Sequence, residues 1–585
     1  MVDIIDINNI TIRTFGWVQD PSDFNSLRKV VEIFNYNSKT HKELVNIKIK
    51  KLVKKRDGQD KLINSLKQRP LKIKYIDLVG TPFKPRNSAR CNGIVQATVK
   101  GQRRQFISDW PADNFVRWAH ALGFIKYNYD SDTFEITQLG LDYTESDEDS
   151  REELEILERA MLSYPPVTRV LSLLSNGDHL TKYDIGKQLG FVGEDGFTSL
   201  PLNILIMTLS NTDEPSEKNK IKTDWDGSSD KYARMICNWI KKLNWVLQRP
   251  KNVTVHLGET SYTETIGHAY MITADGLKAL RKSLGINKVS RINKNVFWEM
   301  FCTKGIDKNY IRTRRAYILK FLIESSKSLT LNDLKEKLLD VGINENTETI
   351  KDDVDGIINI GINIKCESKG YKLYDSINNF VIPRFNISET KKSDISNIKD
   401  ELRTKLKSIP HEYLTLVDIS FDSKQNRLFE MKTMEVLINE YGFSGTHLGG
   451  SRKPDGVIYT TNLENNYGVI VDTKAYSKGY NLPINQADEM ERYIRENITR
   501  DEKINPNKWW LKFNSKVNNY YFLFISSMFK GRYEEQLKRI SMNTGINGAA
   551  LNVINLLLGA NMIKEGKTSL DKLEKEMFLN KEYKF

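Results

Sequence analysis

Apolar and polar positions repeat one pattern in the first two thirds of the chain. In residues 121–141 an apolar-periodic segment ends near a glycine, and two β-rich runs then flank a polar tip. Residues 242–277 repeat this order with a longer polar excursion, and residues 357–374 carry a fainter copy. Glycine or asparagine after the last apolar position is the usual stop of a helix, and β-rich runs around a tip predict a hairpin. Each copy is therefore expected to be a helix followed by a β-hairpin.

A helix-turn-helix-like stretch precedes two of these copies. Residues 179–190 and 329–338 each contain a threonine, Thr181 or Thr330, that can cap a short helix whose isoleucine or leucine side chains face a partner helix. Three helices followed by a hairpin form a winged helix. Winged helices bind DNA in some proteins and serve as protein-protein scaffolds in others, so the pattern alone leaves both roles open.

The second copy carries the strongest indication of DNA contact. Residues 225–235 open its last helix with small capping residues, and Lys231 and Arg234 lie three positions apart, so they share one helix face. A helix with cations near its start can read base edges in the major groove of DNA.

The pattern changes near residue 384. Residues 384–400 are polar and lack apolar periodicity, which predicts a linker. Beyond them, residues 425–441 have apolar positions at helical spacing, and the segments 449–460 and 468–475 look like two neighbouring strands. The second run is continuously apolar, as in a strand buried on both faces of an α/β or mixed sheet.

Composition excludes several classes of protein. With 39% hydrophobic residues the chain is too apolar to be disordered, and it has no uncharged stretch long enough to span a membrane. The first residues are acidic where a secretory signal is basic, which predicts a cytoplasmic protein. The four cysteines and seven histidines are scattered, which disfavours disulfides and sulfur or histidine metal sites. A net charge of +13 favours a polyanionic partner, although the excess is spread over the chain.

Two carboxylates and a lysine mark the ends of the two predicted strands. Asp455, preceded by Pro454, begins the first strand, Asp472 ends the second, and Lys474 points to the same side two residues later. The D/E-x-K triplet recurs elsewhere in the chain, so the triplet alone does not indicate a catalytic site. The copy at Asp472 differs from the others because it follows an apolar strand. Two such carboxylates can hold a hard divalent cation, which promotes phosphodiester hydrolysis by stabilising charge and activating water. A plain salt bridge between Asp455 and Lys474 is the alternative without chemistry.

The neighbouring residues suit a phosphodiester substrate. Lys474 can position or help activate the attacking water and offset charge at the scissile phosphate. The backbone amides of Gly449 and Gly450 and the cations of Arg452 and Lys453 can hold flanking phosphates.

At these residues the sequence resembles a known family. Pro454-Asp455, sixteen intervening residues and Asp472-Thr473-Lys474 match the PD-(D/E)xK nuclease motif. The words GGSRKPDGVIYT and YGVIVDTKAYSKGYNLPINQADEMERY, together with RTFGWVQDP, HLTKYDIGKQLGF and GSSDKYARMI upstream, resemble the FokI/StsI family of type IIS restriction endonucleases. The resemblance covers nearly the whole chain.

The resemblance implies an α+β multidomain fold. Three winged-helix DNA-recognition subdomains, 1–150, 151–290 and 291–383, would be followed by the linker at 384–400 and an α/β nuclease domain with a mixed central sheet at 401–585. It also implies a Mg²⁺-dependent enzyme that binds a short asymmetric double-stranded DNA site, expected to be GGATG. Such an enzyme cuts both strands at a fixed distance outside the site and leaves staggered ends with 5′-phosphates.

The resemblance assigns roles to individual residues. Catalysis falls on Asp455, Asp472 and Lys474, and metal binding on the two aspartates. Asp488 and Arg492 occupy the contact positions of a transient homodimer that forms for double-strand cleavage, although as residues at i and i+4 they are simply expected to form a surface salt bridge. The implied DNA contacts are Gln19, Arg86, Trp110, Trp225, Lys231 and Arg234.

Two departures bear on the DNA site. Asp20 and Asp226 stand where the family has asparagine and glutamate, so Asp20 lacks the amide donor that reads purine edges and Asp226 carries its acceptor on a shorter stem. Two alternatives to the full activity stay open. One is a winged-helix DNA-binding regulator without enzymatic activity, and the other is a relative that nicks one strand and does not pair.

Overall fold

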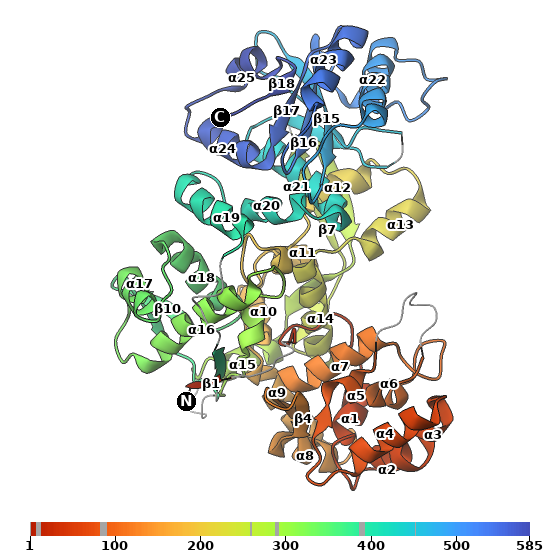
Figure 1. Ribbon diagram of the computed structural model, residues 1–585, viewed down its shortest axis with the longest axis vertical. Coiled ribbons are helices and arrows are strands. Elements are labelled where there is room, and N and C mark those ends of the chain that lie inside the picture. Colours follow the sequence, from red (N-terminus) through yellow and green to blue (C-terminus); the bar gives the residue numbers. More distant parts are fainter. Residues whose placement is uncertain are drawn as a thin grey trace.

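The structure places the first 150 residues and the carboxyl-terminal unit at opposite ends of the molecule (Figure 1). It is a computed structural model, and it describes residues 2–6, 13–81, 90–257, 260–286, 292–378, 380–384, 392–450 and 452–585. Within these ranges, no helix combines the length and the apolar character needed to cross a membrane.

Helix-plus-hairpin units form the first part of the chain, as the repeat predicted. In each of the three predicted copies a helix leads into an antiparallel strand pair, and an upstream segment adds a further edge to that pair. The chain turns after each helix at a residue with positive φ: Gly123 (79°), Asn244 (58°) and Gly361 (102°). The elements are α7 (Asp109–Ala121), β3 (Ile125–Asn128), β4 (Thr133–Ile136) and edge strand β2 (Ile73–Lys74); α14 (Ser228–Lys242), β6 (Val246–Gln248), β9 (Ala269–Ile272) and edge strand β5 (Leu180–Thr181); and α18 (Thr347–Asn359), β10 (Ile364–Glu367) and β11 (Gly370–Leu373), with a bridge from Leu329 to Tyr371.

The two predicted capping threonines begin helices. Thr181 caps α11 (Lys182–Gly186) and Thr330 caps α17 (Leu331–Asp340). In both, the threonine hydroxyl oxygen accepts from the backbone N–H of an aspartate three residues later, and that aspartate accepts from the N–H of the threonine. This reciprocal capping box satisfies N–H groups that would otherwise lack a partner at the start of the helix. The polar excursion of the second unit forms an antiparallel strand pair of its own, β7 (Lys251–Leu257) with β8 (Thr260–Ile266).

The carboxyl-terminal unit is built on a mixed sheet, as expected. In the described part of this unit, six strands follow the order β13-β14-β15-β16-β17-β18; the first three pair antiparallel and the remaining pairs are parallel. The predicted continuous apolar strand is β15, which is buried from its first residue through Thr473. The strands are β13 (Ser444–His447), β14 (Gly456–Tyr459), β15 (Tyr467–Lys474), β16 (Asn519–Ser526), β17 (Gly548–Asn552) and β18 (Lys581–Glu582).

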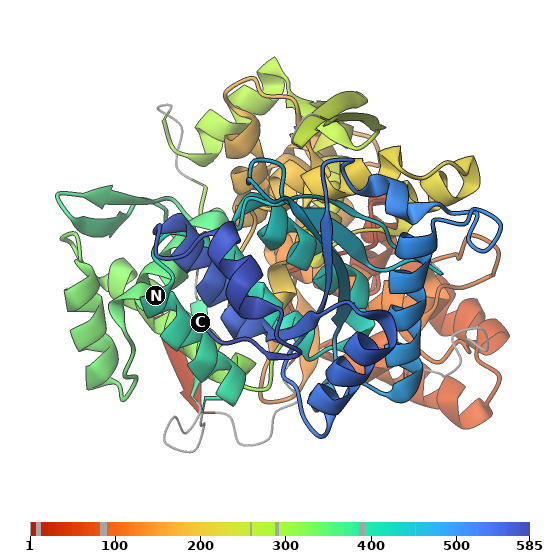
Figure 2. The same ribbon diagram turned by 90° about the horizontal axis from the view of Figure 1, so that it is seen from above.

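Helices cover both faces of this sheet, which Figure 2 shows from above. Side chains alternate between the faces along β15. Val469 and Val471 belong to the core that also contains α21 (Asn426–Asn439), the helix predicted at 425–441. Ile470 points the other way, to the core with α22 (Ile484–Thr499) and α23 (Tyr533–Thr544).

The segment predicted as a linker, 384–400, is partly helical, which corrects the prediction. Residues 385–391 lie outside the described chain, but α19 (Asp394–Lys405) occupies the second half of the segment. Ser393 caps this helix, and Leu402 is buried on its inner face. The sequence pattern concealed the helix because most of its residues are polar and only a narrow apolar stripe packs inward.

A strand pair joins the two ends of the first part of the chain. β1 (Val2–Asp6) runs parallel to β12 (Phe380–Arg384), and Arg384 forms an ion pair with Asp6 at 3.1 Å. The first strand therefore lies beside the point at which the chain leaves for α19.

One helix of the second winged unit packs on the carboxyl-terminal unit. Helix α12 (Leu202–Ser210) lies beside α21 (Figure 1), and its side chains from Ile204 to Leu209 share a hydrophobic core with that helix and with β15. The two parts of the molecule are thus docked through a partly apolar surface.

Candidate active site

Asp455 and Asp472 meet at the ends of two neighbouring strands. Asp455 directly precedes β14, and Gly456 pairs with Val471 of β15. The residue after Val471 is Asp472, so the antiparallel register brings the two carboxylates together. Lys474 ends β15 on the same side as Asp472. The structure therefore assembles the three residues that the motif singled out.

Hydrogen bonds orient each group. One oxygen of Asp455, Oδ2, accepts from the backbone N–H of Thr473 at 2.7 Å and from its hydroxyl at 2.9 Å. The ammonium of Lys474 lies 2.7 Å from Oδ2 of Asp472. The lysine thus pairs with Asp472, whereas the plain salt bridge considered from the sequence would have joined it to Asp455.

The three charges do not balance. Burial raises the pKa of Asp455 well above its usual range, and the nearby charge of Asp472 raises it further. Burial also raises the pKa of Asp472, even though Lys474 lowers it. The pKa of Lys474 is raised because the charges of both aspartates outweigh the effect of burial. The site consequently holds more negative charge than its lysine can offset.

The donor atoms suit a hard divalent cation. Across the described ranges, no group of three or more histidine, cysteine, aspartate or glutamate side chains is placed to hold a metal ion. A cation here would be held by the oxygens of Asp455 and Asp472, with water and substrate oxygens completing its shell. The uncompensated repulsion between the two carboxylates is the observation that fits such an ion.

The glycine turn lies just before β14. Gly449 and Gly450 have φ of 54° and 89°, a backbone region that strongly favours glycine. Hydrogen bonds anchor the following residues: the carbonyl of Arg452 accepts from Asn505, and that of Lys453 accepts from Tyr493. The turn and its cations are therefore held at the same end of the strand as Asp455.

The residues expected to contact DNA fall into separate groups. The N–H of Gln19 donates to the side chain of Asn114 at 3.1 Å, and the amide of Asn114 donates to the carbonyl of Trp110 at 3.0 Å. The ring of Trp110 is exposed. The structure thus brings Gln19 and Trp110 together, while Arg86 lies outside the described residues.

Asp20 and Asp226 both lie within electrostatic reach of Arg234. The side chain of Asp226 is 2% exposed; it accepts a hydrogen bond from Lys182 and forms an ion pair with Arg234 at 3.0 Å. Desolvation raises the pKa of Asp20, and the charge of Arg234 partly offsets that rise. Nothing in the sequence spacing connects residues 20 and 226, so their shared neighbour is not predictable from the sequence. Lys231 opens the same helix as Arg234, one turn earlier.

Trp225 faces the carboxyl-terminal unit. The guanidinium of Arg427, which lies on α21, sits 3.9 Å from the centroid of the Trp225 ring. A cavity of about 380 Å³ beside them is also lined by Lys231 and Lys424. Trp225 therefore lies at the junction between the two parts of the molecule, a position that no sequence signal indicated.

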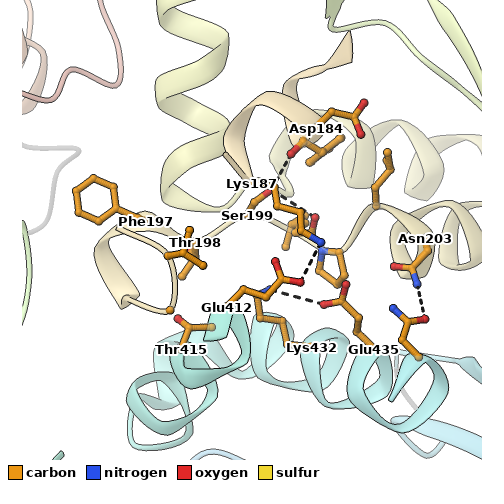
Figure 3. Close-up of a pocket in the computed structure, with 17 residues that line it drawn as sticks. Asp184, Lys187, Phe197, Thr198, Ser199, Asn203, Glu412, Thr415, Lys432 and Glu435 are labelled. Atoms are coloured by element: carbon orange, nitrogen blue, oxygen red, sulfur yellow. Dashed lines mark hydrogen bonds and ion pairs between the residues drawn. The ribbon is translucent and has the colours of Figure 1, made fainter. Parts of the chain in front are cut away.

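A second cavity, of about 250 Å³, lies between the second winged unit, including the start of α12, and α21 (Figure 3). Polar contacts cross it: Lys187 pairs with Glu412 at 2.9 Å, and Asn203 donates to Asn439 at 3.2 Å. The surface between the two parts of the molecule therefore combines the apolar core around α12 with a polar cavity.

The predicted ion pair between Asp488 and Arg492 is wrong. Asp488 instead pairs with Arg539 of α23 at 2.5 Å, and Arg492 lies 3.7 Å from Glu496. Arg539 of the neighbouring helix thus takes the place of Arg492 as the partner of Asp488. The spacing of residues within one helix cannot predict such a contact. The Asp488 side chain is well exposed and that of Arg492 partly so, on the outer side of α22.

Comparison with known proteins places the whole chain. The matching family profiles are FokI recognition domain subdomain 1 over residues 13–146, subdomain 2 over residues 153–290, the FokI D3 domain over residues 301–369 and the FokI cleavage domain over residues 392–584. The fold and the site thus define a type II restriction endonuclease in which recognition domains precede a nuclease domain.

Individual relatives cover the chain almost end to end. It is 49% identical to the type II restriction enzyme FokI of Planomicrobium okeanokoites, over 98% of this chain and 99% of that protein. It is 33% identical to the type II restriction enzyme StsI of Streptococcus sanguinis, over 98% and 96%. Solved structures of FokI, alone and bound to DNA, match with TM-scores of 0.92 and 0.94 at 49% identity, over 98% of this chain and 100% of theirs. The chain belongs to the FokI family of type IIS restriction endonucleases.

Proposed function

We propose that this enzyme binds GGATG in double-stranded DNA and hydrolyses both strands at a fixed distance outside it, with Mg²⁺ as its metal, in the cytoplasm. The observation that carries the proposal is the pair of buried carboxylates, Asp455 and Asp472, with Lys474 at the ends of β14 and β15. The resemblance to FokI supports the expected DNA site and the mode of cleavage.

The geometry supports a separate role for the two aspartates, for Thr473 and for Lys474. Mg²⁺, held by Asp455 and Asp472, would supply a Lewis acid at the scissile phosphate and lower the pKa of a bound water. Thr473 holds Asp455 in place through two hydrogen bonds. Lys474, fixed at 2.7 Å from Asp472, presents a positive charge where negative charge increases on the phosphate oxygens during attack.

Recognition is proposed to use both groups of expected residues. Gln19 and Trp110 form one end of the surface, and the start of α14 forms the other. Asp226 is held inside the protein by Lys182 and Arg234. We therefore assign Asp226 a positioning role: it orients Arg234 for the DNA. The complete set of proposed contacts is Gln19, Arg86, Trp110, Trp225, Lys231 and Arg234.

Cleavage of the second strand is proposed to need a second copy of the nuclease domain. Each chain contributes a single Asp455–Asp472 pair within its described residues, and α22 presents Asp488 and Arg492 to solvent. A transient homodimer through this helix would supply the second site. The cleavage rate on one-site DNA should then rise faster than linearly with enzyme concentration, and substituting Asp488 and Arg492 by alanine should slow second-strand cleavage. A strictly linear dependence would argue against pairing.

One experiment tests the activity and its alternatives. A plasmid with one GGATG site is incubated with the enzyme and Mg²⁺ or EDTA, and the products are mapped by run-off sequencing. Linear DNA formed with Mg²⁺ alone, with 5′-phosphates at one fixed offset, is expected. Open circles as the end product would identify a nicking enzyme. Specific DNA binding without any cleavage would identify a regulator and overturn the proposal.

A further inference from the structure

The amino-terminal arm, residues 13–21, reaches the surface at its proposed DNA-reading residue. Residues 15–18 and Pro21 are buried, whereas Gln19 is half-buried and Asp20 is exposed. The aromatic and aliphatic side chains of the first buried segment belong to the core of the recognition part. The arm therefore presents one short stretch, with Gln19 in it, between buried residues.

Hydrogen bonds hold the backbone of the arm on both sides of Gln19. The hydroxyl of Tyr164 donates to the carbonyl of Gly16 at 2.6 Å, and the indole N–H of Trp239 donates to the carbonyl of Pro21 at 2.8 Å. Both donors belong to the second recognition subdomain, and Trp239 lies on α14, the helix whose start carries other expected DNA contacts. The arm is thus fixed relative to that helix.

The central anchor of the arm is Asn114 on α7, which is 0% exposed. Its Oδ1 accepts from the backbone N–H of Gln19 at 3.1 Å, and its Nδ2 donates to the carbonyl of Trp110, one turn earlier on the same helix, at 3.0 Å. The reversed amide would set its NH₂ group against an N–H and its oxygen against a carbonyl. The two contacts therefore fix the orientation of the carboxamide.

The position of the backbone at Gln19 matters for the reading of bases. A hydrogen bond to a base edge needs a donor–acceptor distance of about 2.7–3.2 Å and a nearly linear arrangement, so a shift of about 0.5 Å weakens it. Contacts to phosphates depend mainly on charge, and the same shift changes them less. An anchor at Gln19 should therefore affect sequence discrimination more than the general affinity for DNA.

We infer that Asn114 is a positioning residue for DNA recognition, because it holds the backbone of Gln19 where that side chain reads the DNA site. Asn114 is fully buried, so it acts on the arm and does not contact DNA itself. The inference rests on the proposed contact between Gln19 and DNA, and it adds a residue of α7 that no sequence motif indicates.

Equilibrium binding of the full-length protein to short duplexes in EDTA tests the inference. One duplex contains GGATG, a second lacks it, and in the others one base pair of the site is changed at a time. Fluorescence anisotropy at one fixed salt concentration gives each dissociation constant. Asn114→Leu keeps the approximate shape of the side chain without its polar atoms. It should weaken binding to GGATG about 5- to 100-fold, the usual worth of one base contact, and leave binding to the duplex without the site unchanged.

The pattern of loss identifies the residue through which Asn114 acts. Asn114→Leu should lose discrimination at the same base pairs as Gln19→Ala, which keeps the backbone N–H but removes the side chain. At those base pairs the double variant should discriminate like Gln19→Ala alone. A purely structural role would lower the folded fraction, which weakens apparent binding to every duplex by the same factor and leaves discrimination unchanged.

Asn35→Leu is the matched control. Asn35 lies in the same subdomain and is 6% exposed; its Oδ1 accepts from the N–H of Asn37 at 3.0 Å, and its amide donates to the hydroxyl oxygen of Thr144 at 2.9 Å. It has the same kinds of contact as Asn114, but its partners lie outside the arm. Asn35→Leu should therefore leave the discrimination among the duplexes unchanged.

The remaining outcomes also decide. If Asn114→Leu does not fold, Asn114→Ala, which adds no bulk, takes its place; if neither folds, the role is structural and the inference is wrong. Wild-type binding, equal losses on all duplexes, losses at base pairs that Gln19→Ala does not affect, or the same loss in Asn35→Leu would also overturn it while the proposed function stands. If Gln19→Ala keeps full discrimination, its proposed base contact fails and the inference falls with it. A wild type that does not prefer GGATG would overturn the proposed function itself.

Discussion

Two buried charge clusters in this protein use similar side chains with opposite results. In α18, Asp353 accepts from Arg314 and Arg315, both at 2.6 Å, and these arginines lower its pKa although burial alone would raise it. In the nuclease domain, Asp455 and Asp472 share one lysine, and the pKa of each is raised. Burial is common to both clusters, so the supply of cations accounts for the difference.

The comparison separates a structural cluster from a functional one. Around Asp353 two arginines satisfy the carboxylate, which ties α18 to α16 (Lys308–Glu324). Such a pair is costly to break because a buried charge is left without a partner. In the candidate active site one lysine faces two aspartates, so the protein itself does not neutralise both carboxylates, and a bound cation can supply the missing positive charge. A buried carboxylate thus indicates chemistry when its own protein leaves it under-neutralised.

The largest effect is expected from Asp472→Asn. If Asp472 holds the metal as proposed, its loss should reduce plasmid cleavage about 10⁴-fold or more. DNA binding, measured by gel shift, should survive. The melting temperature should not fall, since the change removes one of two carboxylates that repel each other. A marked loss of stability would break the comparison by showing that Asp472 is mainly a structural partner of Lys474.

Asp353→Asn should have the reverse profile. Arg314 keeps its ion pair with Glu345 and Arg315 keeps its ion pair with Glu194, so loss of the shared carboxylate should cost about 1–3 kcal/mol of local stability. Hydrogen exchange of the amides in α16 and α18 measures this as a lower opening free energy. The cleavage rate per folded, DNA-bound molecule should stay unchanged. A large loss of rate without faster exchange would contradict the structural assignment.

Asp400 supplies a pH test of intermediate size. Burial raises its pKa, but Arg314, Arg403 and Lys392 outweigh that effect and lower it to about 2. Because the pKa in the unfolded chain is higher, about 3.9, ionised Asp400 stabilises the fold above that value, and the contribution of about 2 kcal/mol is lost as the pH falls towards 2. Asp400→Asn should therefore be less stable than the wild type at pH 7, and this gap should narrow on acidification. Thermal unfolding at pH 7, 4 and 3 measures it, and a constant gap would count against the assignment.

The smallest effect is expected from Asp355→Asn. This residue lies on α18 as Asp353 does, but its ion pair with Lys351 is exposed to solvent. An exposed pair at i and i+4 contributes about 0.5 kcal/mol or less. The same exchange measurement on the same helix thus provides a control for Asp353→Asn. Equal effects from both substitutions would show that burial does not account for the stability that Asp353 contributes.

The sequence predicts features that depend on neighbouring residues in the chain, such as the residues at the ends of strands. Asp472 follows an apolar strand and Pro454-Asp455 opens another, so their meeting could be anticipated, and the structure confirms it. The helix that begins at Asp394 resembles a linker in the sequence because polar residues hide its apolar stripe. Helical spacing predicts Arg492 as the partner of Asp488, whereas the actual partner, Arg539, comes from another helix.

Contacts between the two parts of the molecule had no local signature. Thr208 and His447 are 239 residues apart, and Trp225 and Arg427 come from different domains. Such pairs arise from the docking of complete folded units, which no period or spacing within either segment reports. For this reason the meeting of Asp455, Asp472 and Lys474 is predictable from the sequence, whereas the contacts between the nuclease domain and the recognition part are not.

The parallel pair of β1 and β12 orders events during synthesis. Residues 2–6 cannot pair until residues 380–384 have left the ribosome, which at about 5–20 residues per second takes roughly 20–75 s. By then the intervening winged units have been translated, whereas the nuclease domain, matched over residues 392–584, has not. The recognition part can therefore form its last strand pair, β1 with β12, before the nuclease domain is complete. Whenever a nascent chain contains a complete nuclease domain, it also contains the recognition part on which that domain docks.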